Sequence, residues 1–598
     1  MTVTICLLTY PVDVNKCFPV TTPQNTLFIT LDQSVPLKTV INDLCKTWLI
    51  TEPAEEYALQ FSDEDGRYVT EKNRTEMRNG SILQFAFSPS RITQDILEVL
   101  TKKIKDQMKG TLEQLVRLSS DPAFASEFIN KSGRRILCES LEQRNVKPDE
   151  GLGSALEAFN KLMEYEAWDK PSHKFISVIA NEINQPEDST TTDPKILMNA
   201  LSILESAATS SLSLYSVVES ELSLPKLIHH VQKQTGHPEI QQNAIALINA
   251  LLLKADLPKR KSMISTLSNQ RFRSIVTSCI LDMKQRTPVG SEMAHQLYVL
   301  QTALFSMYDE DINAHPSATK DNVEENLNEL RRLAFEGESG ANDVLNRSRG
   351  STVGSVASAS FHSLQDDFHK LGFSNCKNPI DDFSEFPRLL SLNLMLYFAR
   401  NYTEQFVKIV LENCCRVDRD HECPFVRSSI ELTKLIIDLL KLTMQPSDEG
   451  NLFYPMFFTN EHPLEEFFVI AVLTLNKTWK EMRATTEDFG KVFSVLQQQL
   501  SRSLKDKDAT VTFEKLSNHL HNLNYTEIMK LWQEERSSRE EWENKAKSIL
   551  ELREVIKPNI VKLIERQRLR FLTEGTQFVK YSSKGERIHH PCVMKITV

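Results

Sequence analysis

The chain contains three short stretches that resemble one another, SALEAF at 154–159, NALSIL at 199–204 and NAIALI at 243–248. Their starts lie 45 and 44 residues apart, and a looser copy begins at Met293, 50 residues further on. A period of roughly 40–47 residues with a small residue at one helical position is typical of armadillo and HEAT repeats. The alanine lets neighbouring helices approach closely, and the flanking large apolar side chains fill the shared core. Residues 90–336 of this mostly α chain are therefore predicted to form an armadillo-type α-solenoid with a concave face for partners, an irregular helical bundle being the alternative.

The first 89 residues have a different pattern, because short strand-like stretches surround a single helix. The alternation of apolar residues predicts strands at 2–8, 26–31, 57–61 and 82–87, and the apolar face of 35–48 predicts a helix. A turn is expected at 78–80, because Asn79 and Gly80 tolerate a positive φ. This order resembles a ubiquitin-like roll, and such rolls often bind a small GTPase along an exposed strand edge. Residues 1–89 are predicted to be a Ras-binding-like domain with its contact residues unassigned; a structural module with another partner is the alternative.

The composition is that of a helix-rich globular protein. Of the 598 residues, 25% are charged and only 17 are glycine, and no apolar stretch approaches the roughly 18–20 residues of a membrane helix. The net charge of −10 argues against nucleic-acid binding. Ten cysteines without a regular spacing, and no secretory signal pattern, predict a cytoplasmic chain with reduced thiols. The sequence has no phosphate-loop, dinucleotide-binding, nucleophile-elbow or H-E-x-x-H motif, which favours a binding protein without a cofactor over an enzyme.

Two regions follow the solenoid. Residues 337–362 are rich in Gly, Ser and Ala and are predicted to be a flexible linker. Residues 363–504 are again helical, and Ser428–Glu431 matches a capping box in front of an apolar run. Trp479 belongs to an apolar stripe at helical spacing, so we expect it to anchor a core rather than contact a ligand.

Four residues near position 420 belong to the types that bind zinc, namely Cys414, Cys415, His421 and Cys423. Adjacent cysteines rarely ligate the same tetrahedral ion, and the spacing matches no common zinc finger. We therefore expect buried structural thiols and no metal at this place.

Several strings in the same region resemble the ELMO domain of the engulfment and cell motility proteins. They are Leu371-Gly372-Phe373, Asn378-Pro379, Asp382-Phe383, His421-Glu422-Cys423-Pro424-Phe425, Pro455-Met456-Phe457-Phe458-Thr459, 476–484 and Glu487-Asp488-Phe489. The strings are long and unusual. The family also has a Ras-binding-like roll, armadillo repeats and this domain in the order found above, so the resemblance covers about residues 1–580.

The resemblance implies a regulatory adaptor and not an enzyme. Members of the family bind a DOCK-type guanine-nucleotide exchange factor and promote its activation of Rac, which drives actin remodelling in cell migration and in the engulfment of apoptotic cells. Their N-terminal half receives an upstream Rho- or Arf-like GTPase and keeps the protein autoinhibited until it does so. Two folded halves joined at the linker could then open and close. Such a protein is expected in the cytoplasm, with recruitment to the plasma membrane.

An enzymatic alternative comes from short relatives that have only the ELMO domain. They resemble GTPase-activating proteins for Arf-like GTPases and use an arginine directly after the Asp-Phe pair. An arginine there stabilises the charge of the phosphoryl-transfer transition state. In this chain Asp382-Phe383 is followed by Ser384, and the nearest arginine is Arg388.

The C-terminal region, residues 505–572, is predicted to be helical. From residue 551 to the end it has ten Lys and Arg against five acidic residues, a net charge of +5. Apolar residues at helical spacing predict an amphipathic helix with a basic face, for which a helix in a soluble core is the alternative. In the family this helix precedes a pleckstrin-homology domain, and both dock onto the exchange factor. The resemblance thus implies exchange-factor contacts at Leu563, Ile564, Leu569 and Leu572.

Residues 573–598 resemble the opening of a pleckstrin-homology domain. The sequence ends at Val598, before such a domain could close and without the SH3-binding proline-rich tail of the family. A truncated isoform that competes with a full-length adaptor is therefore a further alternative. A weak association with membranes is also expected.

Overall fold

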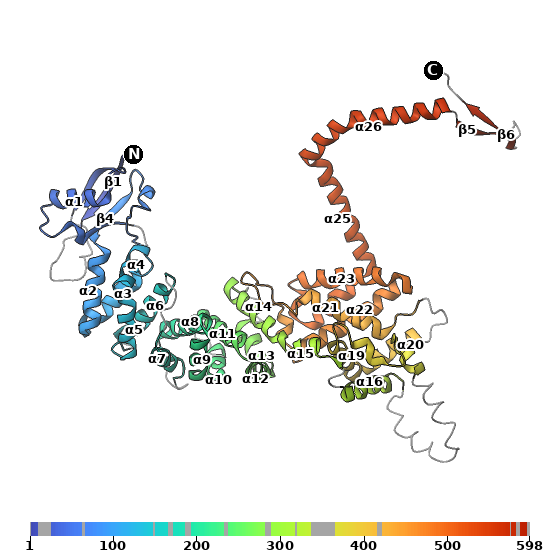
Figure 1. The fold of residues 1–598 in the computed structure, drawn as a ribbon, viewed down its shortest axis with the longest axis horizontal. Coiled ribbons are helices and arrows are strands. Elements are labelled where there is room, and N and C mark those ends of the chain that lie inside the picture. Colours follow the sequence, from blue (N-terminus) through green and yellow to red (C-terminus); the bar gives the residue numbers. More distant parts are fainter. Residues whose placement is uncertain are drawn as a thin grey trace, which may run out of the picture. The chain divides into compact units, whose positions relative to one another are not determined.

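The computed structural model is mostly α-helical (Figure 1). It describes residues 2–9, 25–62, 66–147, 150–165, 171–185, 193–232, 237–281, 289–316, 320–335, 365–414, 421–574, 576–581 and 587–594. The chain forms two compact units. The first contains residues 1–414, 424–470 and 506–516, and the second contains residues 415–423, 471–505 and 517–598.

The N-terminal segment of the first unit is the ubiquitin-like roll that the sequence predicts. Its elements are β1 (Thr2–Thr9), β2 (Asn25–Asp32), α1 (Leu37–Thr47), β3 (Tyr57–Phe61) and β4 (Ile82–Phe87). The sheet has the order β2-β1-β4-β3, with β1 antiparallel to β2 and parallel to β4, and β3 antiparallel to β4. The apolar face of α1, including Leu37, Val40 and Leu44, packs against the inward side chains of the strands and closes a small core.

The solenoid follows directly. Its helices are α2 (Pro89–Lys102), α3 (Lys105–Leu118), α4 (Pro122–Asn130), α5 (Gly133–Glu142), α6 (Leu152–Met163), α7 (His173–Ile183), α8 (Pro194–Ser210), α9 (Leu212–Glu221), α10 (Leu224–Gln232), α11 (Pro238–Lys254), α12 (Leu257–Leu267), α13 (Gln270–Ile275), α14 (Ser291–Phe305), α15 (Asp309–Asn313) and α16 (Lys320–Phe335). The four copies of the repeat lie on α6, α8, α11 and α14, and each of these helices packs on the next. The small residues Ala155, Ala200 and Ala244 are completely buried, which is why the helices can approach. The predicted armadillo-type solenoid is confirmed.

Polar contacts between repeats follow the same period. The Asn243 Nδ2 donates to the Met198 carbonyl at 3.0 Å, and the Tyr165 hydroxyl donates to the Ser120 carbonyl at 2.6 Å. Both pairs are 45 residues apart. The repeats therefore stack in a constant register.

A buried carboxylate joins the roll to the solenoid. Asp121 caps α4, because its Oδ1 accepts the Phe124 amide at 2.8 Å, while its Oδ2 accepts the Tyr68 amide of the roll at 2.8 Å. Asp121 is only 4% exposed and Tyr68 only 1%. One side chain thus satisfies a helix N-terminus and a backbone group of the neighbouring roll.

The remaining helices of the first unit belong to the region that resembles the ELMO domain. They include α19 (Leu389–Asn401), α20 (Thr403–Cys414), α21 (Phe425–Leu440) and the start of α22 (Pro463–Glu481), with the 3-10 turns η7 (Pro379–Phe383) and η9 (Pro455–Phe458). Helix α16 packs on α19 and α20. The Arg400 guanidinium donates twice to the Glu329 carboxylate, at 2.8 and 2.6 Å, and Arg331 pairs with Asp367 at 3.2 Å.

The end of the solenoid is also joined to the segment in front of α22. The guanidinium of Arg273, on α13, is buried and donates from Nη1 to the Phe457 carbonyl at 2.8 Å and from Nη2 to the Glu461 carbonyl at 3.4 Å. The amide of Tyr454 donates to Gln301 Oε1 at 2.8 Å. These contacts hold segments together that are more than 150 residues apart in the sequence.

The structure therefore corrects the expectation of two halves hinged at the linker. Residues on both sides of 337–362 belong to the same compact unit, and the units divide instead inside α22, between Ile470 and Ala471. The physical reason is that the buried contacts of Arg273 and the pairs made by α16 join the flanking segments directly. The linker itself lies outside the described residues.

The predicted capping box at Ser428–Glu431 is wrong. Helix α21 already begins at Phe425, after Pro424 at the N-cap position, so Ser428 and Ser429 lie inside the helix and are buried. Phe425 is 4% exposed, and its burial together with the following residues stabilises an additional first turn that the polar pattern does not reveal. A capping box does occur at Thr485 and Asp488, in front of α23.

The second unit contains the rest of α22 and the C-terminal elements. These are α23 (Phe489–Lys505), α24 (Phe513–Asn522, of which residues 517–522 belong here), α25 (Tyr525–Lys545), α26 (Lys547–Glu574), β5 (Thr576–Tyr581) and β6 (Arg587–Met594). Strands β5 and β6 form a two-stranded antiparallel sheet. Within the described ranges, no helix combines the length and the apolarity that crossing a bilayer requires.

Candidate interaction surfaces

Strand β2 lies at the edge of the sheet of the roll. Its partner on one side is β1, and among the described residues no strand pairs with its other side. The exposed side chains along it are Phe28, Thr30 and Asp32, and Phe28 is 75% exposed. An edge strand presents unpaired N–H and C=O groups, so β2 can accept a further strand from a partner.

The exposed apolar surface continues from β2 across the outer face of the sheet. In the strand register Phe28 is opposite Cys6 of β1, and Cys6 is opposite Ile82 of β4. These three side chains therefore form a row on one face, with Ile82 50% exposed. A partner that pairs with β2 would find an apolar row beside the strand edge.

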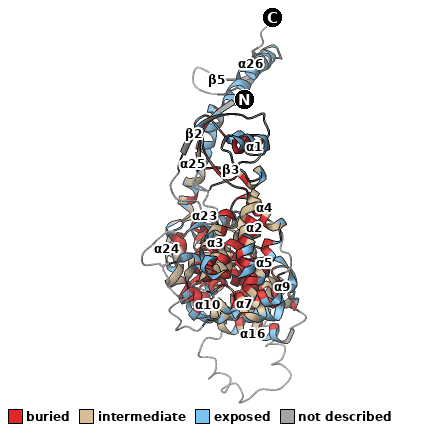
Figure 2. Ribbon diagram, turned by 90° about the vertical axis from the view of Figure 1, so that its left-hand side faces the viewer, coloured by how far each residue is buried: buried red, intermediate tan, exposed pale blue. Residues whose placement is uncertain are grey.

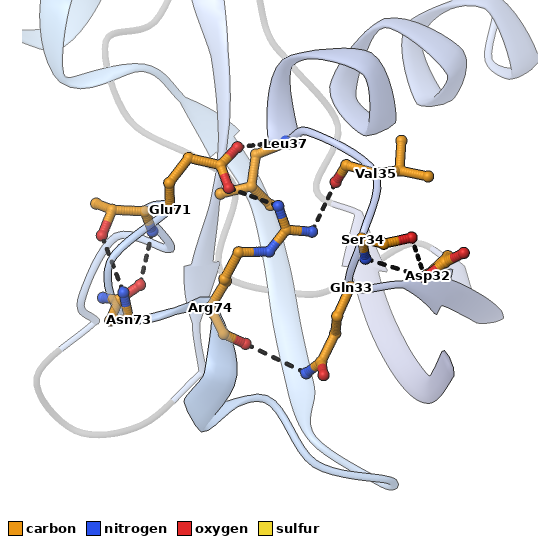
Figure 3. Close-up of polar contacts among 9 residues, drawn as sticks. Asp32, Gln33, Ser34, Val35, Leu37, Glu71, Asn73 and Arg74 are labelled. Carbon is orange, nitrogen blue, oxygen red and sulfur yellow. Dashed lines mark hydrogen bonds and ion pairs between the residues drawn. The ribbon is translucent and has the colours of Figure 1, made fainter. Parts of the chain in front are cut away.

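An arginine fixes the chain between β2 and α1 (Figure 3). The Arg74 Nη2 donates to the Val35 carbonyl at 2.6 Å, and its Nη1 is 2.5 Å from Glu71 Oε2. The other oxygen of Glu71 accepts the Leu37 amide at 2.7 Å and so supplies the cap that α1 lacks from its own N-cap residue. The hydrogen bond from Leu37, followed by that from Arg74, lowers the pKa of the Glu71 carboxyl.

Hydrogen bonds also fix the first residues after β2 (Figure 3). Asp32 Oδ1 accepts the Ser34 amide at 2.9 Å and the Ser34 hydroxyl at 2.8 Å, which forms a tight local turn. The Gln33 Nε2 donates to the Met77 carbonyl at 3.0 Å. The end of the edge strand is therefore preorganised, which lowers the entropy cost of binding a partner there.

A second candidate surface lies on helix α26. Its exposed large apolar side chains are Leu550, Leu552, Val555, Ile556, Ile560, Val561, Leu563, Ile564 and Leu569. A shallow hollow on one side of the helix is lined by Ile549, Leu552, Arg553, Ile556, Lys557, Ile560 and Val561. Figure 2 shows α26 in the colour of exposed residues. An amphipathic helix with an uncovered apolar stripe and basic residues beside it fits a groove on a partner protein.

The four predicted exchange-factor contacts do not all share one side of α26. Leu563, Ile564 and Leu569 are 54%, 42% and 55% exposed, and the side chain of Leu572 lies outside the described residues. At 3.6 residues per turn, Leu563 lies close to the stripe that includes Ile560, whereas Leu569 is rotated from Ile560 by about 180°. The structure thus places Leu563 and Ile564 near the hollow and Leu569 on the opposite side.

The strings that resemble the ELMO domain turn out to be structural. Gly372 has a φ of +87°, and a Cβ there would lie 2.7 Å from the Cβ of Pro424, so only glycine fits. Trp479 is 1% exposed, as predicted, and its Nε1 donates to the His421 carbonyl at 3.1 Å. The Trp479 ring also meets the Phe489 ring edge-on, with centroids 6.1 Å apart. These residues determine the fold rather than a reaction.

The residues of zinc-binding type that the structure describes also have structural roles. The His421 Nδ1 is 2.9 Å from the Ala484 carbonyl, and Cys423 is 4% exposed. Cys415 and the side chain of Cys414 lie outside the described residues. Among the residues that are described, no group of three His, Cys, Asp or Glu side chains has the arrangement of a metal site.

Arg388, the arginine nearest to the Asp382-Phe383 pair, also makes a structural contact. Arg388 is half-buried, is the residue directly before α19, and its Nη1 donates to the Asn313 carbonyl. Phe383 is completely buried, and Asp382 accepts the Ser374 amide at 2.7 Å. Burial raises the pKa of the Asp382 carboxyl.

Family models match three parts of the chain. The model described as the ELMO protein N-terminal Ras-binding domain matches residues 12–88, the ELMO armadillo-like helical domain matches 123–281, and the ELMO/CED-12 family matches 307–493. Engulfment and cell motility protein 1 of Homo sapiens is 39% identical over 568 residues, which are 93% of this chain and 75% of that protein. The chain belongs to the engulfment and cell motility (ELMO) family.

Two further relatives agree with this assignment. Engulfment and cell motility protein 2 of Homo sapiens is 38% identical over 566 residues, covering 94% of this chain and 76% of that protein. Engulfment and cell motility protein 3 of Mus musculus is 38% identical over 561 residues, covering 93% and 74%. The family role is in engulfment and cell motility, and these names describe cellular processes rather than an enzymatic reaction.

Sequence reasoning missed part of both surfaces. It left the GTPase contacts within 1–89 unassigned, because strand order, and with it the edge position of Phe28, depends on pairing between distant segments. It also missed Ile549 and Leu552 at the start of the α26 stripe. Ile549, Leu552, Ile556 and Ile560 are three or four residues apart, so the helical spacing in the sequence could have indicated both.

Proposed function

We propose that this ELMO family chain is a regulatory adaptor. It binds an upstream Rho- or Arf-like GTPase through the N-terminal roll and a DOCK-type exchange factor through α26, and thereby promotes activation of Rac, actin remodelling and engulfment. It acts in the cytoplasm and is recruited to the plasma membrane by its partners. The proposal rests on the family membership together with two surfaces that the described parts of the fold leave uncovered.

The observation that carries the proposal is the apolar stripe of α26. Ile556, Ile560 and Leu563 are between 39% and 54% exposed although each is a large aliphatic side chain. Because about half of each side chain is exposed, burying the exposed part in a partner contributes about half of the value for a fully exposed side chain, roughly 1 kcal/mol each. Several of them on one helix supply enough free energy for a stable complex, and the flanking Arg553 and Lys557 select an acidic groove.

The exchange-factor arm is tested by measuring the dissociation constant of the full chain and a DOCK-type exchange factor by calorimetry. Ile560→Asp places a charge in the stripe and is expected to weaken binding at least tenfold. Val555→Asp is the matched control, because Val555 is also exposed, at 69% against 49% for Ile560, and is rotated from Ile560 by about 140° around the same helix. Equal affinities of the Ile560→Asp variant and the unmodified chain would refute this arm of the proposal.

The GTPase arm rests on β2 and its fixed connection to α1. Phe28→Glu introduces a charge beside the strand edge and is expected to abolish binding of the GTP-loaded partner without lowering the thermal stability of the roll. Leu49→Glu is the control, because Leu49 is 86% exposed in the same domain but lies after α1 and not on the sheet. Loss of binding in both variants, or in neither, would contradict an interface on β2.

The GTPase-activating alternative has less support. The position directly after Asp382-Phe383 holds Ser384, whose side chain has no positive charge to place against a phosphate. Arg388 donates to the Asn313 carbonyl, so its guanidinium would have to leave that contact before it could reach a nucleotide. Acceleration of GTP hydrolysis by the full chain that disappears in Arg388→Ala would support this alternative over the adaptor.

A further inference from the structure

The side of α26 that faces away from the hollow carries a row of basic residues. Lys562, Arg566 and Arg570 follow one another at intervals of four residues, which places them along one side of an α-helix. At about 100° per residue, these three side chains and Leu569 all lie within about 60° of Val555. These five residues are called the basic row below.

All five side chains of the basic row are exposed. Its apolar members, Val555 and Leu569, are 69% and 55% exposed. Lys562 and Arg566 form no ion pair with another residue that the structure describes. The fold therefore does not use these side chains for its own packing, and their charges can act on a partner.

The charge along this part of α26 is almost entirely positive. Residues 555–573 contain five basic residues and one acidic residue, Glu565. Glu565 lies about 80° from Val555 around the helix, at the margin of the basic row. A helix side with several cations and no anion among them is complementary to an anionic surface.

A membrane with anionic lipids fits the basic row better than a groove on a protein does. Lysine and arginine side chains are long and flexible, so they can reach lipid phosphates while their carbon chains lie along apolar surface. Val555 and Leu569 can enter the boundary between headgroups and acyl chains, as the apolar residues of interfacial helices do. The hollow on the other side of α26 is lined mainly by aliphatic side chains, and it fits a protein partner instead.

We propose that the basic row binds the anionic headgroups of a membrane. Lys562 and Arg566 are rotated by about 160° and 120° from Ile560, so the row stays accessible when an exchange factor covers the apolar stripe. This contact is direct, and it adds to the recruitment of the chain by its partners. A basic residue close to an anionic surface strengthens binding about fivefold, so the three together contribute roughly 100-fold.

The test measures cosedimentation of the full chain, without an exchange factor, with phosphatidylcholine vesicles that contain about 30% phosphatidylserine. Saturable binding is expected, and it should be at least tenfold weaker with pure phosphatidylcholine and at high salt. Lys562→Glu with Arg566→Glu should weaken binding at least twentyfold, and Leu569→Ser severalfold. Arg536→Glu with Arg539→Glu is the matched control, because it reverses the same charge at exposed positions of α25 and should leave vesicle binding nearly unchanged.

Calorimetry with the exchange factor separates the basic row from the apolar stripe. Lys562→Glu with Arg566→Glu should leave the affinity for the exchange factor unchanged, and Ile560→Ser should leave vesicle binding unchanged. The proposal is overturned if vesicle binding does not require phosphatidylserine, if the Lys562 and Arg566 double variant binds vesicles as the unmodified chain does, or if the α25 control loses binding equally. A double variant that weakens the exchange-factor complex but not vesicle binding would assign the row to the protein interface instead. Because the vesicles are used alone, failure of the exchange-factor arm would not affect this test.

Discussion

Replacement of Arg273 by alanine probes the junction between the solenoid and the ELMO region. The buried guanidinium donates at 2.8 Å to the Phe457 carbonyl and at 3.4 Å to the Glu461 carbonyl, and burial lowers its pKa. A hydrogen bond to a charged group contributes about 1.5–3 kcal/mol, and the second contact is long, so we expect the segment at 455–461 to lose about 2–3 kcal/mol of local stability. A factor of ten corresponds to about 1.4 kcal/mol, so local opening should become roughly 30 to 150 times more frequent.

Hydrogen exchange measured by mass spectrometry is the suitable assay, because a chain with two compact units need not unfold in one step. Peptides that cover 453–462 and 270–281 should lose protection by this factor in Arg273→Ala. Arg271→Ala is the matched control, because Arg271 is exposed on the same short helix. Unchanged protection at 453–462 in Arg273→Ala would refute the conclusion that this contact holds the two regions together.

Three further predictions concern single residues whose contacts stabilise the fold. Asp121→Asn keeps one oxygen for the Phe124 amide but turns an NH₂ towards the Tyr68 amide, so the 66–70 segment should lose about 1–3 kcal/mol of protection against hydrogen exchange while α4 remains formed. Unchanged exchange at 66–70 would contradict this. Gly372→Ala should lower thermal stability strongly, because its Cβ would meet Pro424 at 2.7 Å, whereas Gly490→Ala, with nothing within 4 Å, should be neutral or slightly stabilising; equal melting temperatures would contradict this reasoning. Hydrogen bonds from Lys491, followed by those from Thr485, lower the pKa of Asp488 to about 2 from 3.8, so its contribution is complete above about pH 5 and is lost as the pH falls towards 2. The difference in melting temperature between the unmodified chain and Asp488→Asn should therefore shrink over that range, and a difference that does not depend on pH would contradict the assignment.

The parts of the fold that the sequence predicts well are those controlled by local periodicity. The repeat of about 45 residues places Ala155, Ala200 and Ala244 at helix contacts, and these contacts exist because only a small side chain permits the close approach. The strand and helix pattern of the first 89 residues likewise agrees with the observed elements within a few residues. In both regions, local propensity and burial favour the same secondary structure.

The sequence could not reveal features that depend on distant packing. Ser428 and Ser429 resemble a helix start, but the burial of Phe425 one turn earlier decides where α21 begins. The segments before and after the linker are joined by hydrogen bonds from Arg273 to main-chain carbonyls more than 180 residues away. No local sequence pattern encodes such a contact. For the candidate surfaces, periodicity indicated the α26 stripe, whereas the exposed edge at Phe28 followed only from the order of the strands.

We propose that this chain acts by binding an exchange factor and increasing its activity on Rac. The most direct measurement follows the release of fluorescent GDP from Rac in the presence of a DOCK-type exchange factor, with and without the full chain. We predict faster release with the unmodified chain, no acceleration with Ile560→Asp, and no effect of the chain when the exchange factor is left out. A chain that binds the exchange factor without accelerating release, or that changes the nucleotide state of Rac alone, would contradict the account.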